Sequence, residues 1–78
     1  MKILPVNHKN LIEKLAAIEH QQWVHWSQSV AENVPFSIRS KWQKSWVPYP
    51  ELDEELKEMD RVWARKVLSF FQKQKLIS

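Results

Sequence analysis

The chain contains no glycine among its 78 residues, and this absence removes whole classes of fold. Phosphate-cradling loops and dinucleotide-binding turns need glycine, because it combines positive φ angles with close approach of the backbone to a ligand. Tight β-hairpins depend on the same residue, so the absence also argues against an all-β domain. We therefore expect an all-α protein without a glycine-rich nucleotide loop.

The length predicts a single domain over residues 1–78, with an extended lead-in over 1–9 and a frayed tail over 75–78. A chain of this size buries only about 60% of the surface of its unfolded form, so its stability should lie near the low end of about 5–15 kcal/mol. There is no cysteine, and five tryptophans are the expected compensation. Because we find neither a signal peptide nor an apolar run of ~20 residues, we expect a cytoplasmic protein with no membrane partner.

Apolar residues recurring in steps of three and four predict three helices, over residues 10–32, 37–45 and 53–74. The expected N-caps are Asn10, Ser37 and Asp53. Asn10 is followed three residues later by Glu13, a spacing typical of a capping box. We expect these apolar residues to be largely buried: Trp23, Trp26, Trp42, Leu56, Trp63, Val67 and Phe70.

The segment Pro48-Tyr49-Pro50 predicts a stiff turn, because each proline fixes its own φ and pushes the preceding residue towards extended backbone. The two long helices flank a short linker that contains this turn and should therefore pack antiparallel. Facing residues would then have numbers that sum to roughly 85. This register places Trp23 near Trp63.

Polar side chains interrupt the apolar stripes of both long helices, and the antiparallel register brings them into one neighbourhood. Buried charged groups need partners, and such pairs lock the register of two helices. The expected network consists of Glu19, His20, Asp60, Arg61 and Arg65. Within it, we expect Arg61 or Arg65 to bond Glu19. Asp60 is expected to bond His20, His25 or the Tyr49 hydroxyl.

Three short motifs follow one another along the chain: His20-Gln-Gln-Trp23, Pro48-Tyr49-Pro-Glu-Leu52 and Lys57-Glu-Met-Asp60-Arg61. Together they resemble the RyR domain, the small helical repeat of ryanodine receptors that also occurs free-standing in bacterial and phage proteins. That family has His-x-x-Trp on its first helix, a Pro-Tyr-x-x-Leu turn and Lys-x-x-Asp-Arg on the next helix, and the match covers about residues 15–71. The chain is also similar to small phage-type proteins with Glu-His-x-x-Trp and Asp-Arg-x-Trp-Ala.

The resemblance implies a non-enzymatic ligand-binding module, since prokaryotic RyR modules are associated with sensing nucleotide-derived ligands. The candidate ligand-binding residues are His20, Trp23, Tyr49 and Arg61. Arg61 can fork onto a phosphate or carboxylate, and the rings can stack a base. One departure is the Gly-Trp-x-Tyr-Gly loop of the family, which residues 35–46 replace here. The alternative is a protein-interaction or self-association module with no small ligand.

Neither catalysis nor metal binding has a supporting pattern. His20 and His25 are five residues apart and point to different faces, whereas zinc-binding helices use i, i+4 spacing. Cations and aromatics alternate between Arg39 and Trp46, a pattern that could bind single-stranded nucleic acid but that a solvated helix face explains equally well. We therefore expect no enzyme activity, cofactor, metal or nucleic-acid partner.

The aromatic residues exceed what three small helices can bury. Phe70 and Phe71 are adjacent and cannot share one direction, and Trp23 and Trp26 subtend different angles on their helix. Some of this area should remain on the surface of a monomer, in a patch large enough to associate. We expect a homo-oligomer, most simply a two-fold dimer. The alternative is a monomer in which the short helix covers the surplus.

Overall fold

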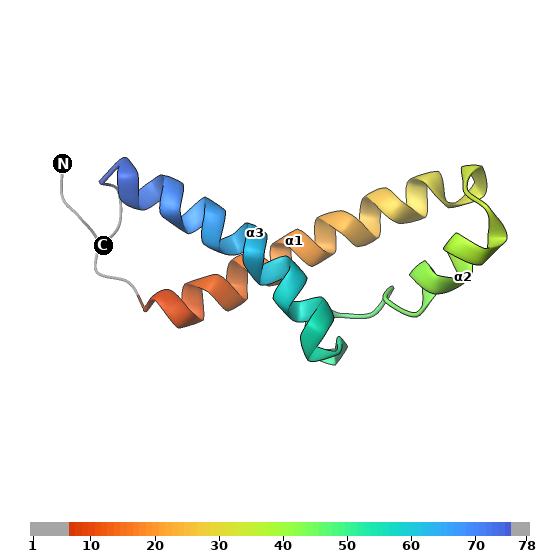
Figure 1. Ribbon diagram of the computed structural model, residues 1–78, viewed down its shortest axis with the longest axis horizontal. Helices are drawn as coiled ribbons and strands as arrows, with labels where there is room; N and C mark the ends of the chain where they lie inside the picture. The colour runs from red at the N-terminus through yellow and green to blue at the C-terminus, as the bar shows by residue number, and fades with distance from the viewer. Residues whose placement is uncertain (1–6, 76–78) are drawn as a thin grey trace.

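The computed structural model describes residues 7–75, which form three α-helices and two short 3₁₀ turns with no strand among them (Figure 1). In chain order these are α1 (His8–Val30), η1 (Ala31–Asn33), α2 (Phe36–Gln43), η2 (Tyr49–Glu51) and α3 (Glu54–Lys73). The predicted all-α class is confirmed. Most of the predicted lead-in and tail lies outside the described residues. In the described part of the chain, no helix is both long and apolar enough to cross a membrane.

Two of the helices, α1 and α2, begin earlier than predicted. α1 begins at His8, because the Asn7 side chain accepts a hydrogen bond from the Asn10 amide at 3.1 Å. The expected cap at Asn10 and the extended backbone at residues 8–9 are therefore wrong. α2 begins at Phe36, directly after Pro35, and not beyond Ser37.

At α3, Asp53 occupies the N-cap position as predicted, although its side chain makes no capping hydrogen bond among the described residues. Tyr49 is not extended but opens the 3₁₀ turn η2, whose second residue is Pro50. A proline fits there because the first amides of a helical turn have no partner within it. The Glu51 amide then donates to the Pro48 carbonyl at 2.9 Å.

The two long helices cross near their middles (Figure 1). Ala16 of α1 and Ala64 of α3 are both fully buried and belong to one cluster with Tyr49 and Leu52. Alanine has no side chain beyond Cβ, so two helices can approach closely where alanines face each other. The arms diverge on either side of this crossing, and the molecule measures 49 × 22 × 14 Å.

Several aromatic residues predicted to be buried are exposed. Trp26, Trp63 and Phe70 are 53%, 56% and 56% exposed, so these predictions are wrong. The others of that group, Trp23, Trp42, Leu56 and Val67, are half-buried. The reason is a rotation of each helix: α3 turns Ala64 and Leu68 inward, and successive residues of a helix differ by about 100° in direction. Trp63 therefore points away from the side that meets α1.

We expect Ala16→Leu to destabilise the protein strongly, because a larger side chain at the crossing forces the helices apart. Overpacking typically costs about 1–3 kcal/mol, and each kcal/mol lowers the melting temperature of a domain of this size by roughly 4–8 °C. Thermal unfolding followed by circular dichroism measures the change. Lys14→Leu, at an exposed position of the same helix, is the control and should melt close to the wild type. Equal melting of the two variants would contradict close packing at Ala16.

Candidate ligand cleft

His20 is the buried polar residue at the centre of α1, with 5% of its surface exposed. Its Nε2 lies 2.7 Å from the Val47 carbonyl oxygen, and its Nδ1 lies 3.6 Å from the Asp60 carboxylate. Because a carbonyl oxygen only accepts, Nε2 carries a hydrogen, and Nδ1 is the nitrogen that faces Asp60. Burial raises the pKa of Asp60, and its electrostatic interaction with His20 opposes this rise. His20 thus ties α1 both to the segment before η2 and to α3.

Aromatic rings continue from His20 across to α2. The Trp23 ring stacks on His20 with centroids 6.0 Å apart and an interplanar angle of 21°. Trp42 of α2 meets Trp23 edge-on, again at 6.0 Å, and contacts Trp26 at 5.8 Å. Such ring pairs are favourable beyond their buried area. Trp42 is therefore the side chain that holds α2 against α1.

A cleft of about 530 Å³ lies beside these rings, between α1, α2 and α3. Its lining residues are His20, Trp23, Lys41, Trp42, Ser45, Leu52, Leu56, Met59 and Asp60. Ligand pockets usually have about 300–1,000 Å³ and combine apolar walls with a few convergent polar groups. This cleft has that composition, with an ammonium group at Lys41 and a carboxylate at Asp60.

A second groove, of about 840 Å³, lies along α1 and the 46–50 segment and also includes His20 in its lining. This segment is fastened to α1 by Trp46, whose Nε1 donates to the fully buried Ser27 hydroxyl at 2.9 Å. Among the described residues that line this groove there is no lysine, arginine, aspartate or glutamate. It can accept an apolar group but offers no fixed cation to an anionic ligand.

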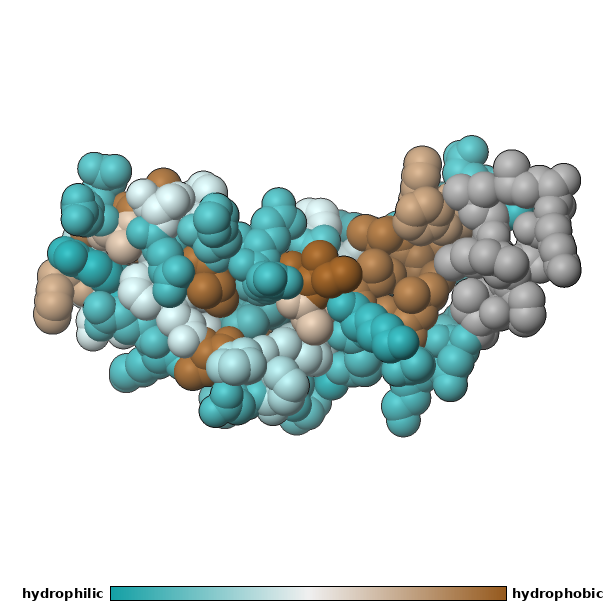
Figure 2. All heavy atoms as spheres, turned by 180° about the vertical axis from the view of Figure 1, so that it is seen from behind, coloured by the Kyte–Doolittle hydropathy of each residue, from teal (hydrophilic) through white to brown (hydrophobic). Residues whose placement is uncertain are grey.

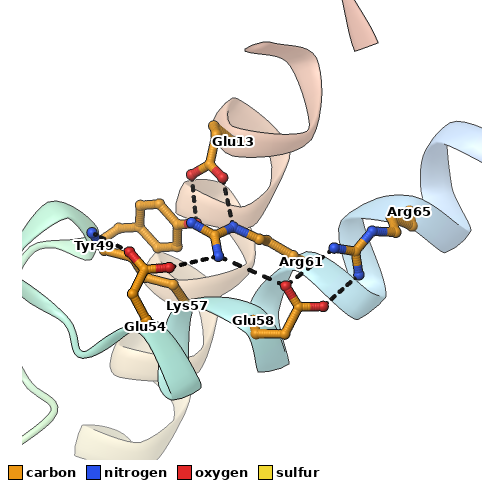
Figure 3. A network of polar contacts seen from close by, with 7 residues as sticks. All are labelled: Glu13, Tyr49, Glu54, Lys57, Glu58, Arg61 and Arg65. Atoms are coloured by element: carbon orange, nitrogen blue, oxygen red, sulfur yellow. Dashed lines mark hydrogen bonds and ion pairs between the residues drawn. The ribbon is translucent and has the colours of Figure 1, made fainter. Parts of the chain in front are cut away.

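Glu13, about one turn before Ala16 on α1, joins Tyr49 and Arg61 into a polar network (Figure 3). The Tyr49 hydroxyl donates to one carboxylate oxygen at 2.7 Å, and Arg61 Nε donates to the other at 2.5 Å. Arg61 also bonds Glu54 at 3.0 Å and lies 3.7 Å from Glu58. The guanidinium is therefore surrounded by three carboxylates of its own chain.

The structure brings some of the predicted site residues together and separates others. His20 and Trp23 line the cleft side by side, whereas Tyr49 and Arg61 meet through Glu13 and are not among its lining residues. The predicted contact between Asp60 and His20 is present.

The predicted bond from Arg61 or Arg65 to Glu19 is wrong, because Arg61 bonds Glu13 and Glu54 and Arg65 bonds Glu58 at 2.7 Å. Glu13 was assigned to a capping box and so was missed. Its signal was its spacing: it lies three and seven residues before Ala16 and His20 and therefore shares their helix face. The sequence pattern predicts a solvated basic face for Lys41 and a core position for Trp42, whereas both line the cleft.

In residues 7–75 no group of three or more histidine, aspartate or glutamate side chains is arranged to hold a metal ion. No protein-family model, curated protein or solved structure matches this chain.

We expect the phenol of Tyr49 to titrate abnormally, because burial, and then its bond to Glu13, raises its pKa to about 12 from 10.0. A raised pKa means that the folded state favours the neutral phenol over the phenolate. This contribution to stability is present below pH 10 and is lost as the pH rises towards 12. Tyr49 is the single tyrosine of the chain, so the absorbance of tyrosinate reports it directly. A midpoint near 10 in the folded protein would contradict the buried hydrogen bond.

Glu13→Gln should destabilise the protein at neutral pH by about 1 kcal/mol, a modest value because the carboxylate is 38% exposed and screened by solvent. The bonds from Tyr49 and Arg61 hold the pKa of Glu13 below 4.5. This stabilisation is present above pH 4.5 and is lost as the pH falls through the lowered pKa. The difference in melting temperature between wild type and variant should therefore shrink in acid. Glu54→Gln, which removes a carboxylate that is 75% exposed, should change the melting temperature less.

Proposed function

We propose that this chain is a non-enzymatic binding module of RyR type that takes a small, planar, anionic ligand of nucleotide-like chemistry. The ligand occupies the cleft of about 530 Å³ between α1, α2 and α3. The observation that carries the proposal is the pair of half-buried tryptophans, Trp23 and Trp42, beside Lys41 and Asp60.

The aromatic wall favours a planar ligand. Trp23 and Trp42 meet edge-on and line the same space as the side chains of Leu56 and Met59. A base stacked on an aromatic side chain gains roughly 1–3 kcal/mol, whichever base it is, because every base has a flat π-face. The apolar residues of α3 supply the opposite wall.

The polar groups of the cleft favour a ligand with both an amino group and an anionic group. Asp60 accepts hydrogen bonds at the inner end, where the exocyclic amine of a base can donate to it. Lys41 is exposed and can pair with a phosphate as a point charge. We place the anion contact at Lys41 and not at Arg61, because three carboxylates already surround the Arg61 guanidinium.

The RyR-like order of motifs requires an antiparallel pair of long helices joined through the proline-framed turn. Two contacts support this arrangement: His20 approaches Asp60, and His8 approaches Gln72, so rising numbers on α1 meet falling numbers on α3. We also propose a bacterial or phage origin, on the basis of the resemblance, and a cytoplasmic location, on the basis of the composition.

A protein-interaction module without a small ligand is the second candidate. The observation that favours it is the exposure of Trp26, Phe36, Trp63 and Phe70, of which Phe36 is 74% exposed. Trp63 and Phe70 lie seven residues apart on one face of α3, and exposed apolar side chains that gather in this way typically mark contact with another macromolecule.

A thermal-shift assay with the four ribonucleoside monophosphates and the matching nucleosides tests the ligand proposal. A ligand at 100 times its Kd adds about 2.7 kcal/mol of stability, which is a large shift for so small a domain. Lys41→Gln should weaken nucleotide binding while leaving nucleoside binding unchanged. Lys44→Gln removes an exposed cation just beyond the end of α2 that does not line the cleft, and should bind like the wild type. If no nucleotide raises the melting temperature of the wild type or of Lys44→Gln, this ligand class is excluded.

A further inference from the structure

The outer face of α3 carries an apolar stripe with a charge at each end. We call it the outer stripe, and its members are Glu55, Met59, Val62, Trp63, Lys66, Phe70 and Lys73. They follow one another at intervals of one to four residues and all point within about 60° of one direction on a helix with 3.6 residues per turn. Ala64 and Leu68 lie on the opposite side, buried towards α1. The outer stripe is therefore the face of α3 that α1 does not cover.

The apolar members of the outer stripe are widely exposed. Met59, Val62, Trp63 and Phe70 retain 65%, 42%, 56% and 56% of their surface. Since a large side chain can bury roughly 150–250 Å², these four leave on the order of 400 Å² of apolar area. That is as large as the biggest patch of a typical monomer, about 300–600 Å².

The rest of the molecule does not enclose this surface. The opposite face of the molecule, seen in Figure 2, carries a further group of apolar side chains near the end where α1 begins and α3 ends. The radius of gyration is 15.2 Å, against about 11–12 Å for a compact domain of this length. The buried apolar residues in the described part of the chain are few: Ala16, Ala31, Tyr49, Leu52, Ala64 and Leu68. Such an open fold gains much from covering one more helix face.

The charges of the outer stripe indicate what covers it. Glu55 stands at its first end and Lys73 at its last, so the stripe is complementary to itself when reversed. A parallel copy would place like charges together, which is unfavourable. An antiparallel copy places Glu55 opposite the partner's Lys73 at both ends.

The same register satisfies the apolar residues. With Glu55 opposite the partner's Lys73, Met59 faces the partner's Phe70 and Trp63 faces the partner's Lys66, each to within one residue. The ammonium group of Lys66 can lie in the centre of such an interface, because its Nζ is already 4.1 Å from the centroid of the Trp63 ring within one chain. A lysine held over a tryptophan face is partly compensated by the ring.

We infer that a second copy of this chain covers the outer stripe, with the two α3 helices antiparallel about a two-fold axis that passes between Trp63 and Lys66. A standard interface buries about 800 Å² on each partner, of which some 56–65% is apolar. The exposed apolar area of the outer stripe, together with its charged ends, is of that size. The variants that test this inference lie outside the cleft lining, so its failure is distinguishable from failure of the ligand proposal; Met59 is the one member of the outer stripe that also lines the cleft.

Light scattering across a tenfold concentration range at micromolar protein measures the oligomeric state. We expect a mass of twice the 9.4 kDa of one chain. Trp63→Glu and Phe70→Glu should each raise the dimer dissociation constant at least a hundredfold and give monomers that remain helical by circular dichroism. Ile18→Glu is the matched control, since Ile18 is 59% exposed on α1 and should leave the dimer intact. A mass near 9.4 kDa at every concentration, or a dimer that only Ile18→Glu disrupts, would overturn the inference.

A charge exchange tests the antiparallel register separately. Glu55→Lys and Lys73→Glu should each weaken the dimer, because each creates two like-charge contacts across the two-fold axis. The double variant restores opposite charges at both ends and should bring the dissociation constant back to within a few-fold of the wild type. Single variants that leave the dimer unchanged, or a double variant weaker than either, would show that the helices do not pair in this register.

Discussion

The close approach of α1 and α3 at Ala16 and Ala64 is the contact on which the rest of the structure depends. Because neither residue has a side chain beyond Cβ, the helices approach where they cross, and the arms then diverge (Figure 1). A crossing of this kind buries little apolar area. The large residues lie beyond it, in the space between the arms or on their outer faces, and this leaves both a cleft and uncovered aromatic rings.

Two polar contacts hold α1 in place near the crossing, one before Ala16 along the helix and one after it. His20 reaches the Val47 carbonyl and faces Asp60, while Glu13 accepts from Tyr49 and Arg61. Ion pairs that solvent reaches contribute little each, but these contacts also hold the segment around η2 against α1. In a chain with so small an apolar core, they position the walls of the cleft as much as they stabilise the fold.

The helices themselves were predictable from local signals, because proline and apolar spacing act within a few residues. Their rotation was not. The pattern of hydrophobic residues predicted that Trp63 faces α1. At the crossing, however, the helices need a small side chain, so Ala64 faces α1 and Trp63 is exposed. The pair of His20 and Asp60 was predicted because an error of about a turn in register still keeps them near each other. Register does not explain why Arg61 bonds Glu13: Glu19 stands opposite Arg61 in the same register that pairs His20 with Asp60. Glu13 lies on the other flank of α1 from Glu19, and the long arginine side chain reaches that flank.

α3 divides its surface among three tasks, and Met59 belongs to two of them. Its inner side meets α1, one flank lines the cleft, and the outer stripe is open to a second copy. Met59 lies both in the lining of the cleft and on the outer stripe. A partner helix against Met59 would therefore limit the movement of one cleft wall. If both proposals hold, the two events are thermodynamically linked: a ligand that binds the dimer more tightly than the monomer must strengthen dimerisation by a corresponding factor for each occupied cleft.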